Sequence, residues 1–355
     1  MRAVTISDIA DRMGISKQSV GFALGNYPNS RTRLGFETRR RILETARRLG
    51  YVPHHAGRRL ARARSSSRAT SFDQVGLILL PGADGAVDTV CLMMMQGAEP
   101  ELYQFHASLT FVRVASDEDW EKVNRLSRAG GVDGWLVYGA VTDQAVRPLT
   151  ASKIPFVILG DHRCTQPVHS VNIDNFAVGQ MAAEHLAALG HRRIAYLDSR
   201  LELVYQRQIH AGFRAAVKKL GLDEDARLIS ITSSLWSKPG GALVVEWLRD
   251  VGATALFAPE PNWAVELWRV LDRYQIEVPN EISLLGCEPA WSSAKSQNFT
   301  RLELPMAGVG GQGARLLHRV VTQPGTAVSE LKISPLLIEG WSTVAPSSRN
   351  TRTTN

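Results

Sequence analysis

Short apolar runs alternate with amphipathic stretches over residues 75–341, and this alternation limits the possible folds more than any other feature. Runs such as VGLILL, PFVILG and ISLLGC predict buried strands, and stretches such as NFAVGQMAAEHLAALG and AVELWRVLDRYQI predict helices. Strands that alternate with helices form parallel sheets covered by helices on both faces. Because the pattern contains about ten strands, we expect two sheets rather than one.

The positive charge is concentrated at the N-terminal end of the chain. The first 68 residues contain 15 Lys and Arg against 4 Asp and Glu, a net charge of +11, so the remaining residues carry −4 of the total of +7. A compact basic head on a mildly acidic body is typical of a polyanion-binding module joined to a second domain. A merely solvated surface would not concentrate basic residues in this way.

Composition and motifs exclude several other classes. The length of 355 residues and the 44% hydrophobic content allow sizeable cores. No apolar run reaches the roughly 18 residues that a membrane-spanning helix needs, and the first residues are polar, so we expect a cytoplasmic protein without a membrane partner. Three cysteines far apart in sequence fit a reducing compartment. The segment HRCTQPVH lacks the paired ligands of a zinc site, and we expect neither a metal nor a cofactor.

The first two expected helices are short and carry clear capping signals. In TISDIADRMG, Thr5 and Asp8 have the spacing of a capping box, and Gly14 can end the helix in the left-handed conformation. Ser16 is positioned to cap a second helix, whose inward residues are expected to be Val20, Ala23 and Leu24. The residues expected to point outward are Lys17, Gln18, Gly21 and Phe22.

A third helix is expected over about 37–49, and it completes a helix-turn-helix pattern. The residues that it is expected to bury are Ile42, Leu43, Ala46 and Leu49, and those expected on its outer face are Arg39, Arg40, Arg41, Arg47 and Arg48. The following segment, HHAGRRLARA, could form one or two turns of helix. It is interpreted either as a flexible basic linker or as a segment that folds on DNA and inserts Leu60 into the minor groove, with Arg58, Arg59 and Arg62 on phosphates.

Residues 5–62 resemble the DNA-binding head and hinge of the LacI/GalR family of bacterial transcription regulators. The words that carry the resemblance are TISDIA, GIS, ETRRRILETARRLGYVP and the hinge that ends in Leu60. The resemblance implies base contacts from Lys17, Gln18 and Phe22. It also implies DNA contact by Thr5, phosphate contacts from Ser16 and Ser19, and minor-groove insertion of Leu60 flanked by Arg58 and Arg59.

Some head residues differ from the usual pattern of the family. The chain has Gly21-Phe22 where the family has Ser-Arg, and Gly57 where it has Ala. Phe22 cannot make the paired hydrogen bonds that arginine makes to guanine, but it can pack on a thymine methyl, which is also base recognition. We therefore expect the second helix to read a different operator. A head that has lost specific binding is the alternative.

The resemblance continues over the rest of the chain, in VDGWLV, IPFVILGD, SVNIDN and VPNEISLLG. It implies an effector domain like the periplasmic sugar-binding proteins, in which two Rossmann-like lobes of parallel sheet bind a ligand between the carboxyl ends of their strands. The expected fold is thus an all-α head with a hinge, followed by a two-lobed α/β domain.

The expected domains follow from this resemblance. The helix-turn-helix head covers 1–53, the hinge helix and linker 54–71, the effector-binding and dimerisation domain 72–345, and a disordered tail 346–355. Within the effector domain, lobe 1 is expected over about 72–172 and 302–325, and lobe 2 over about 173–298 and 331–344.

The expected effector-binding residues depart from those of a sugar regulator. The residues placed near the ligand are Asp161, Arg207, Trp236, Glu260, Glu288 and Trp291. The position of the arginine that clasps the family's ligand falls on Ile209 instead, and Glu260-Pro261 and Glu288-Pro289 replace the usual Asn-Asp and Asp-Asp pairs. A cationic or less hydroxylated ligand therefore stays as open as a sugar or related metabolite, and so does a regulator without an effector.

An enzyme is the competing class, and the segment GVGGQG, residues 308–313, is the motif that favours it. A dinucleotide site requires these glycines directly after a buried strand, but LELPMA contains a proline, so we interpret them as a loose helix start. No other catalytic motif is evident, and we expect no enzyme. We expect a homodimeric transcription regulator, and a repressor rather than an activator. It is expected to bind a near-palindromic double-stranded operator in the nucleoid and to respond to a small-molecule effector. The alternative is a nonspecific DNA or ligand binder.

Overall fold

The chain is described by a computed structural model that covers residues 4–24, 34–49, 51, 72–81, 89–128, 131–198, 203–222, 227–230, 238–289 and 298–347. It divides into two compact units. The first comprises residues 1–73 with 321–324, and the second comprises residues 74–320 with 325–355. Each unit has its own hydrophobic core and is described by itself.

The first unit contains three helices around one small core. They are α1 (Ile6–Met13), α2 (Lys17–Ala23) and α3 (Phe36–Leu49). Residues from all three helices meet in this core, and its fully buried members are Ile9, Ala10, Val20, Ala23, Ile42 and Ala46. The apolar residues recur three or four positions apart in each helix, which is why each helix buries one face.

The ends of α1 and α2 confirm the capping signals of the sequence. The Thr5 hydroxyl accepts a hydrogen bond from the backbone N–H of Asp8, and the Asp8 carboxylate accepts one from the backbone N–H of Thr5 at 2.7 Å. Gly14 ends α1 with φ 64°, in the left-handed region. The Ser16 hydroxyl then accepts from the backbone N–H of Ser19 at 3.1 Å and so fixes where α2 begins.

Two expectations about this unit are wrong. Gly21 was expected to face outward, but it is buried, because a residue without a side chain lets neighbouring groups cover the helix backbone at that point. Leu43 was expected to be buried, but 38% of it is exposed. It lies one position beyond Ile42, and the narrow core of three short helices covers only the stripe of Ile42 and Ala46.

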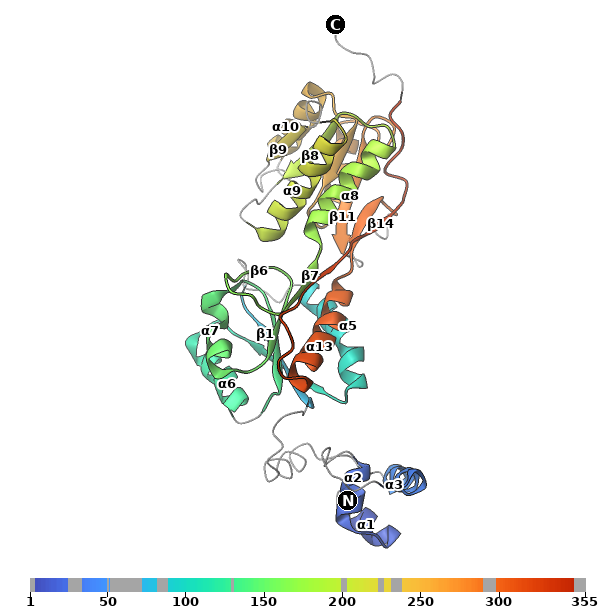
Figure 1. Cartoon of the computed structure of the whole chain (residues 1–355). Coiled ribbons are helices and arrows are strands. Elements are labelled where there is room, and N and C mark those ends of the chain that lie inside the picture. The colour runs from blue at the N-terminus through green and yellow to red at the C-terminus, as the bar shows by residue number, and fades with distance from the viewer. Residues whose placement is uncertain are drawn as a thin grey trace. The chain divides into compact units, whose positions relative to one another are not determined.

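The second unit contains two six-stranded sheets, as the alternating pattern predicted, and they form the two lobes seen in Figure 1. All strand pairs of the lobe 1 sheet are parallel. Its strands, in spatial order, are β13 (Glu330–Ile333), β7 (Ser170–Ile173), β5 (Phe156–Leu159), β3 (Gly134–Tyr138), β1 (Gln74–Leu79) and β2 (Ser108–Arg113). A short ladder beside it pairs β4 (Val141–Thr142) with β6 (His162–Arg163).

The lobe 2 sheet is parallel except for one edge strand. That strand, β14, runs antiparallel to β12. The strands in spatial order are β14 (Leu336–Ile338), β12 (Arg301–Leu304), β11 (Ser283–Pro289), β10 (Ala255–Ala258), β8 (Ile194–Asp198) and β9 (Arg227–Ser230).

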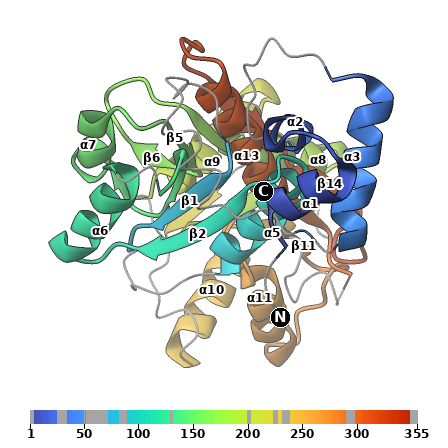
Figure 2. The same ribbon diagram turned by 90° about the horizontal axis from the view of Figure 1, so that it is seen from below.

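Helices cover both faces of the lobe 1 sheet. They are α5 (Thr89–Gln104), α6 (Asp117–Arg128), α7 (Asp143–Ser152) and α13 (Met306–Thr322). Helices α6 and α7 lie on one side of β1, and α5 and α13 lie on the other, as Figures 1 and 2 both show. On the first side, Val123 of α6 and Leu149 of α7 pack against a buried cluster that includes Trp135.

Helices also cover both faces of the lobe 2 sheet. They are α8 (Asn175–Ala188), α9 (Val204–Lys219), α10 (Lys238–Asp250) and α11 (Trp263–Arg273). Val244 of α10 and Leu267 of α11 belong to one buried cluster with Leu256 of β10. Phe213 of α9 packs on the opposite face, with its ring centroid 5.0 Å from that of Tyr196 in β8.

Two helices were not predicted from the sequence, and the residues of two strands were assigned to the wrong lobe. Helices α5 and α7 contain Pro100 and Pro148, which weaken the helical signal because proline cannot donate the backbone hydrogen bond. Strand β12 was expected in lobe 1 but pairs with β11 in the lobe 2 sheet. Strand β13 was expected in lobe 2 from residue 331, but it pairs with β7 in the lobe 1 sheet. The chain therefore passes between the lobes after β12 and again after β13.

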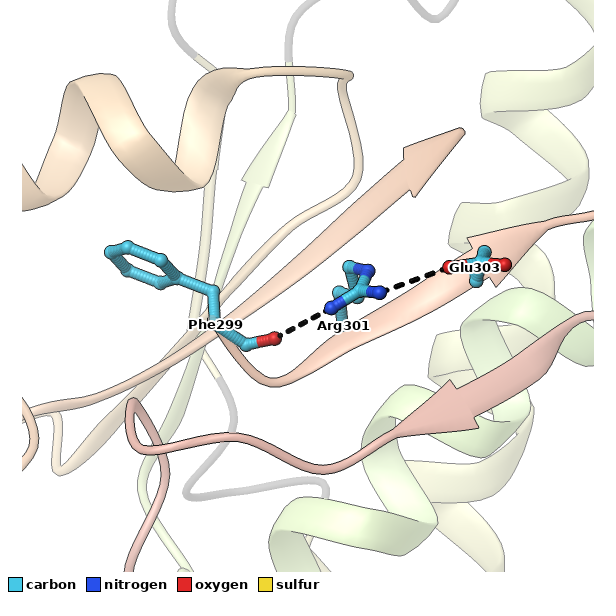
Figure 3. A network of polar contacts seen from close by, with 3 residues as sticks. All are labelled: Phe299, Arg301 and Glu303. Atoms are coloured by element: carbon cyan, nitrogen blue, oxygen red, sulfur yellow. Dashed lines mark hydrogen bonds and ion pairs between the residues drawn. The ribbon is translucent and has the colours of Figure 1, made fainter. Parts of the chain in front are cut away.

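Strand β12 carries a buried arginine. Arg301 is 4% exposed; it donates from Nη2 to the Glu303 carboxylate at 3.0 Å and from Nη1 to the carbonyl oxygen of Phe299 at 3.3 Å (Figure 3). Glu303 and Phe299 stand on either side of Arg301 in the same strand region, so these contacts stiffen the strand locally. A buried charge must be paired to be tolerated, and Glu303 provides the pair.

The segment after β14 is fixed to lobe 2 by a buried histidine. His191 is 2% exposed, and its Nδ1 lies 2.9 Å from the Thr254 hydroxyl. Its Nε2 lies 3.0 Å from the Ser283 hydroxyl and 2.9 Å from the carbonyl oxygen of Val344. Burial lowers the pKa of His191 below its ordinary value of 6.5, with a smaller lowering contribution from the nearby charge of His185 and a raising one from the Val344 carbonyl.

We expect the free energy of unfolding to fall as the pH decreases below about 6.5, because the unfolded chain then binds a proton that His191 resists in the folded state. Above that pH the contribution is fully present. Urea titrations between about pH 8 and pH 5 measure the slope, which should be smaller in His191→Gln. Substitution of the exposed His106 by glutamine is the control; an equal slope in all three proteins would contradict the assignment to His191.

Candidate functional site

The first turn of α2 presents two polar side chains. Lys17 and Gln18 are exposed, as expected, and among the described residues neither makes a hydrogen bond or ion pair. Phe22, one turn further, is half-buried. The cap at Ser16 and the left-handed Gly14 fix the start of α2 relative to α1. Side chains on such a capped helix are held in place to contact an external surface.

The serines expected near phosphates are already bonded to each other. The hydroxyls of Ser16 and Ser19 lie 2.9 Å apart, and Ser16 also accepts the Ser19 N–H. A hydroxyl has one donor and two acceptor positions. The cap therefore leaves a hydroxyl hydrogen of the pair available to an external oxygen.

Helix α3 carries the arginines that were expected on its outer face, and all five are exposed. Arg40 is paired with the glutamates on either side of it, with N–O distances of 3.1 Å to Glu37 and 3.9 Å to Glu44. These pairs are more than half exposed and contribute little stability. Among the described residues Arg47 and Arg48 make no ion pair, so the end of α3 is positively charged.

Five expected site residues lie outside the described residues. They are Arg58, Arg59, Leu60, Trp236 and Trp291. The remaining expected effector residues all lie on the second unit.

Asp161 lies just beyond the carboxyl end of β5, as the sequence predicted, and takes part in a polar network that joins both lobes. Its Oδ1 accepts hydrogen bonds from the side-chain amides of Asn172 at 2.5 Å and Asn175 at 3.3 Å. Asn175, the first residue of α8, also donates to the side chain of Gln208 in α9 at 3.2 Å. Asp161 of lobe 1 is thereby linked to α8 and α9 of lobe 2.

Burial raises the pKa of the Asp161 carboxyl, and this effect exceeds the lowering effects of the Asn172 amide, the neighbouring His162 and the backbone N–H of Tyr205. A carboxylate in this setting has lost part of its hydration. It therefore gains more from a bound hydrogen-bond donor or cation than an exposed carboxylate does.

Glu260, just after β10, is the corresponding carboxylate of lobe 2. Its Oε1 accepts from the side-chain amide of Gln206 at 2.8 Å, and the Tyr205 hydroxyl donates to the same carboxylate at 3.2 Å. Tyr205 thus contacts Glu260 through its hydroxyl and Asp161 through its backbone. This single residue brings together two carboxylates that stand about 100 residues apart in the sequence.

Glu288 is completely buried, and its carboxylate accepts a hydrogen bond from the protein backbone. Both of its carboxylate oxygens lie 2.8 Å from the backbone N–H of Asn262. Asn262 precedes α11 and has φ 67°, in the left-handed region. Glu288 therefore holds the entry to α11, next to the loop that carries Glu260.

We expect Glu288→Ala to lower the free energy of unfolding by about 2 kcal/mol, because it leaves the partly buried N–H of Asn262 without the Glu288 acceptor. Urea denaturation followed by fluorescence measures this. Glu288→Gln keeps one acceptor oxygen and should cost less than half as much. An alanine variant as stable as the glutamine variant would show that the bond to Asn262 is not stabilising.

Arg207 does not join this network. It lies on α9 and is exposed, whereas Ile209, the position that matches the family's ligand-clasping arginine, is 1% exposed and part of the core. Several members of the network were not predicted from the sequence. They are Asn172, Asn175, Tyr205, Gln206 and Gln208. Polar residues at the carboxyl end of β7 and in the first turns of α8 and α9 were a signal that could have identified them.

Two glycines allow α8 and α9 to approach closely enough to form the network. A Cβ atom at Gly179 would lie 1.8 Å from the carbonyl oxygen of Ile209, and one at Gly212 would lie 1.9 Å from that of Phe176. Only glycine fits at either contact. Close packing of α8 on α9 therefore explains the glycine at position 212.

Two protein families match the second unit. The family described as periplasmic binding proteins and sugar binding domain of LacI family matches residues 78–254, and the periplasmic binding protein-like domain matches residues 183–343. Together they cover both lobes, including the network around Asp161 and Glu260. The chain belongs to the LacI family.

Two related transcription regulators extend the similarity beyond the two lobes. The HTH-type transcriptional regulator AglR of Rhizobium meliloti is 26% identical over 324 residues, which are 90% of this chain and 87% of that protein. Catabolite control protein A of Priestia megaterium is 24% identical over 326 residues, with 90% and 93% covered. Since each match spans about nine-tenths of the chain, both extend beyond residues 78–343, the part that the two family models cover.

The fold of this LacI-family member is shared with a solved repressor. The Lac repressor dimer bound to operator and the anti-inducer ONPF has a TM-score of 0.67 at 19% identity and covers 97% of this chain and 100% of its own. Within the described residues, no helix is long and apolar enough to cross a bilayer. The same residues contain no group of three or more His, Cys, Asp or Glu side chains that could hold a metal ion.

Proposed function

We propose that this LacI-family protein is a sequence-specific DNA-binding transcription regulator, acting as a homodimeric repressor under the control of a small-molecule effector. The observation that carries the proposal is the capped α2, whose exposed Lys17 and Gln18 stand at the start of the helix in a chain related to helix-turn-helix regulators over about nine-tenths of its length. Two heads in a dimer would bind a near-palindromic operator. The protein would act in the cytoplasm, on the nucleoid.

The effector would bind where Asp161 and Glu260 come together. The network contains two carboxylates and several amides, and Tyr205, Asn175 and Gln208 connect the two lobes through it. A ligand that binds these groups would favour one arrangement of the lobes over another by its difference in affinity for the two arrangements. The acceptors suit a ligand rich in hydroxyl or amine donors, such as a sugar or related metabolite.

The test of the proposed function is selection of bound sequences from a random DNA pool by the full chain at about 150 mM salt, where the Debye length is about 8 Å. The expected result is a two-fold symmetric enriched site. Binding without any enriched site, with an affinity set by salt alone, would overturn sequence-specific regulation and favour nonspecific DNA binding.

A further inference from the structure

A groove lies on lobe 1, along α7. It has a volume of about 730 Å³ and lies between α7 and residues 165–169. Apolar side chains form much of its lining, among them Val146, Leu149, Phe156 and Val168. Cavities that bind small molecules have volumes of about 300–1,000 Å³ and similar apolar linings. The size and lining of this groove therefore suit a small organic molecule.

The groove is separate from the network around Asp161. Neither Asp161 nor Glu260 lines it. Pro155 and His169, which do line it, directly precede β5 and β7, whereas Asp161 follows the carboxyl end of β5. The two regions thus involve opposite ends of the same strand, so a molecule in the groove would not occupy the effector position.

Two cations border the groove without an ion-pair partner. Arg147 and Lys153 both line it and are exposed, and no described residue forms an ion pair with either. Asp143 stands four residues before Arg147, a spacing at which helical side chains can pair. Its carboxylate instead accepts hydrogen bonds from the backbone N–H of Thr165 at 3.0 Å and from the Thr165 hydroxyl at 2.8 Å. Arg147 therefore makes no ion pair with Asp143, and although the Asp143 carboxylate also lines the groove, Arg147 and Lys153 give the lining an excess of positive charge.

The backbone at Lys153 adds an independent observation. Lys153 ends α7 with φ 55° and ψ 27°, in the left-handed region that glycine adopts most easily. A residue with a side chain is strained in this conformation, and such residues cluster at functional sites. The chain keeps a lysine where glycine would be more stable, and that lysine borders the groove.

We propose that this groove is a second ligand site, for a small organic anion with an apolar body, such as an aryl-alkyl carboxylate. The apolar body packs on Val146, Leu149 and Phe156, and the anionic group lies against Arg147 and Lys153. The charge and the apolar lining together define the ligand: a neutral or cationic molecule of the same shape loses the contacts to the two cations.

Calorimetric titration of the full chain with 4-phenylbutyrate, 4-phenylbutan-1-ol and 4-phenylbutylamine tests the proposal, since these probes share one apolar body and differ in charge. The acid should bind with a dissociation constant below about 1 mM, and the alcohol and the amine at least about fivefold more weakly. Arg147→Gln and Lys153→Gln should each weaken acid binding by about fivefold. Lys122→Gln, which removes an exposed cation from the neighbouring α6, should leave it unchanged.

Lys153→Gly separates binding from folding. It relieves the backbone strain, so the melting temperature should stay the same or rise while the acid binds more weakly. Equal affinities for the three probes, no binding of the acid, or unchanged acid affinity in both glutamine variants would each overturn the proposal. None of these results depends on whether the head recognises a specific operator.

Discussion

Replacement of Gly310 by alanine is expected to lower the free energy of unfolding by about 3 kcal/mol. A Cβ atom at this position would lie 1.7 Å from the carbonyl oxygen of Met94 in α5, and a Cβ atom at Gly97 of α5 would lie 1.7 Å from the carbonyl oxygen of Ala307 in α13. The two helices approach backbone to backbone, so no side-chain rotation can relieve the overlap. They would have to separate, and the core beneath them would be exposed.

The same helix provides a matched control for this prediction. At Gly308 of α13 the nearest atoms to an added Cβ are 3.6 Å away, an ordinary contact distance. Gly308→Ala should therefore stabilise the protein by up to about 1 kcal/mol through helix propensity alone. Urea denaturation of both variants measures the difference. Equal effects of the two substitutions would show that the approach of α5 and α13 does not require glycine at position 310.

The glycines of GVGGQG show what could be predicted from sequence and what could not. The expected helix is present. The glycines are not a loose helix start, however, because α13 begins at Met306 and Gly310 and Gly313 lie inside it, where Gly310 contacts α5. The partner of a close helix contact lies about 200 residues away in the sequence, and a local pattern carries no information about it.

The positions of the strands in the sequence were predicted better than the sheet that each strand joins. Buried parallel strands are continuous apolar runs, so β1, β3 and β5 were evident from VGLILL, GWLVYG and PFVILG. The position of Asp161 at a strand end followed directly. Which sheet β12 and β13 join depends on where the chain crosses between lobes, and both were assigned to the wrong lobe.

The effector network was only partly predictable for a related reason. Asp161 and Glu260 were expected from the family resemblance, which places each after a buried strand, and the structure links both to Tyr205. Tyr205 was missed, since it joins the carboxylates through its backbone on one side and its hydroxyl on the other. Glu288 was expected to face the ligand, but its two oxygens bind a backbone N–H, so its bond to Asn262 gives it a structural role whether or not a ligand also contacts it.

The double substitution Lys17→Ala with Gln18→Ala is expected to lower the affinity for the enriched operator by roughly 100-fold, since each well-formed base contact contributes about 1–3 kcal/mol. This rests on the proposed function. Both side chains are exposed and have no partner among the described residues, so we expect their removal to leave the free energy of unfolding nearly unchanged. Fluorescence anisotropy at fixed salt, with the operator and a scrambled duplex, measures the change.

Binding to the scrambled duplex distinguishes base-specific recognition from nonspecific attraction to the charged DNA backbone. Loss of one lysine should weaken binding to scrambled DNA only slightly, because a single phosphate contact changes the affinity and its salt dependence by a small step. Lys122→Ala, the same charge change on α6, should leave both affinities unaltered. A parallel loss on operator and scrambled DNA would mean that Lys17 and Gln18 contact the phosphate backbone. Specificity would then depend on the half-buried Phe22 and on the hinge, because an apolar ring can pack on a thymine methyl.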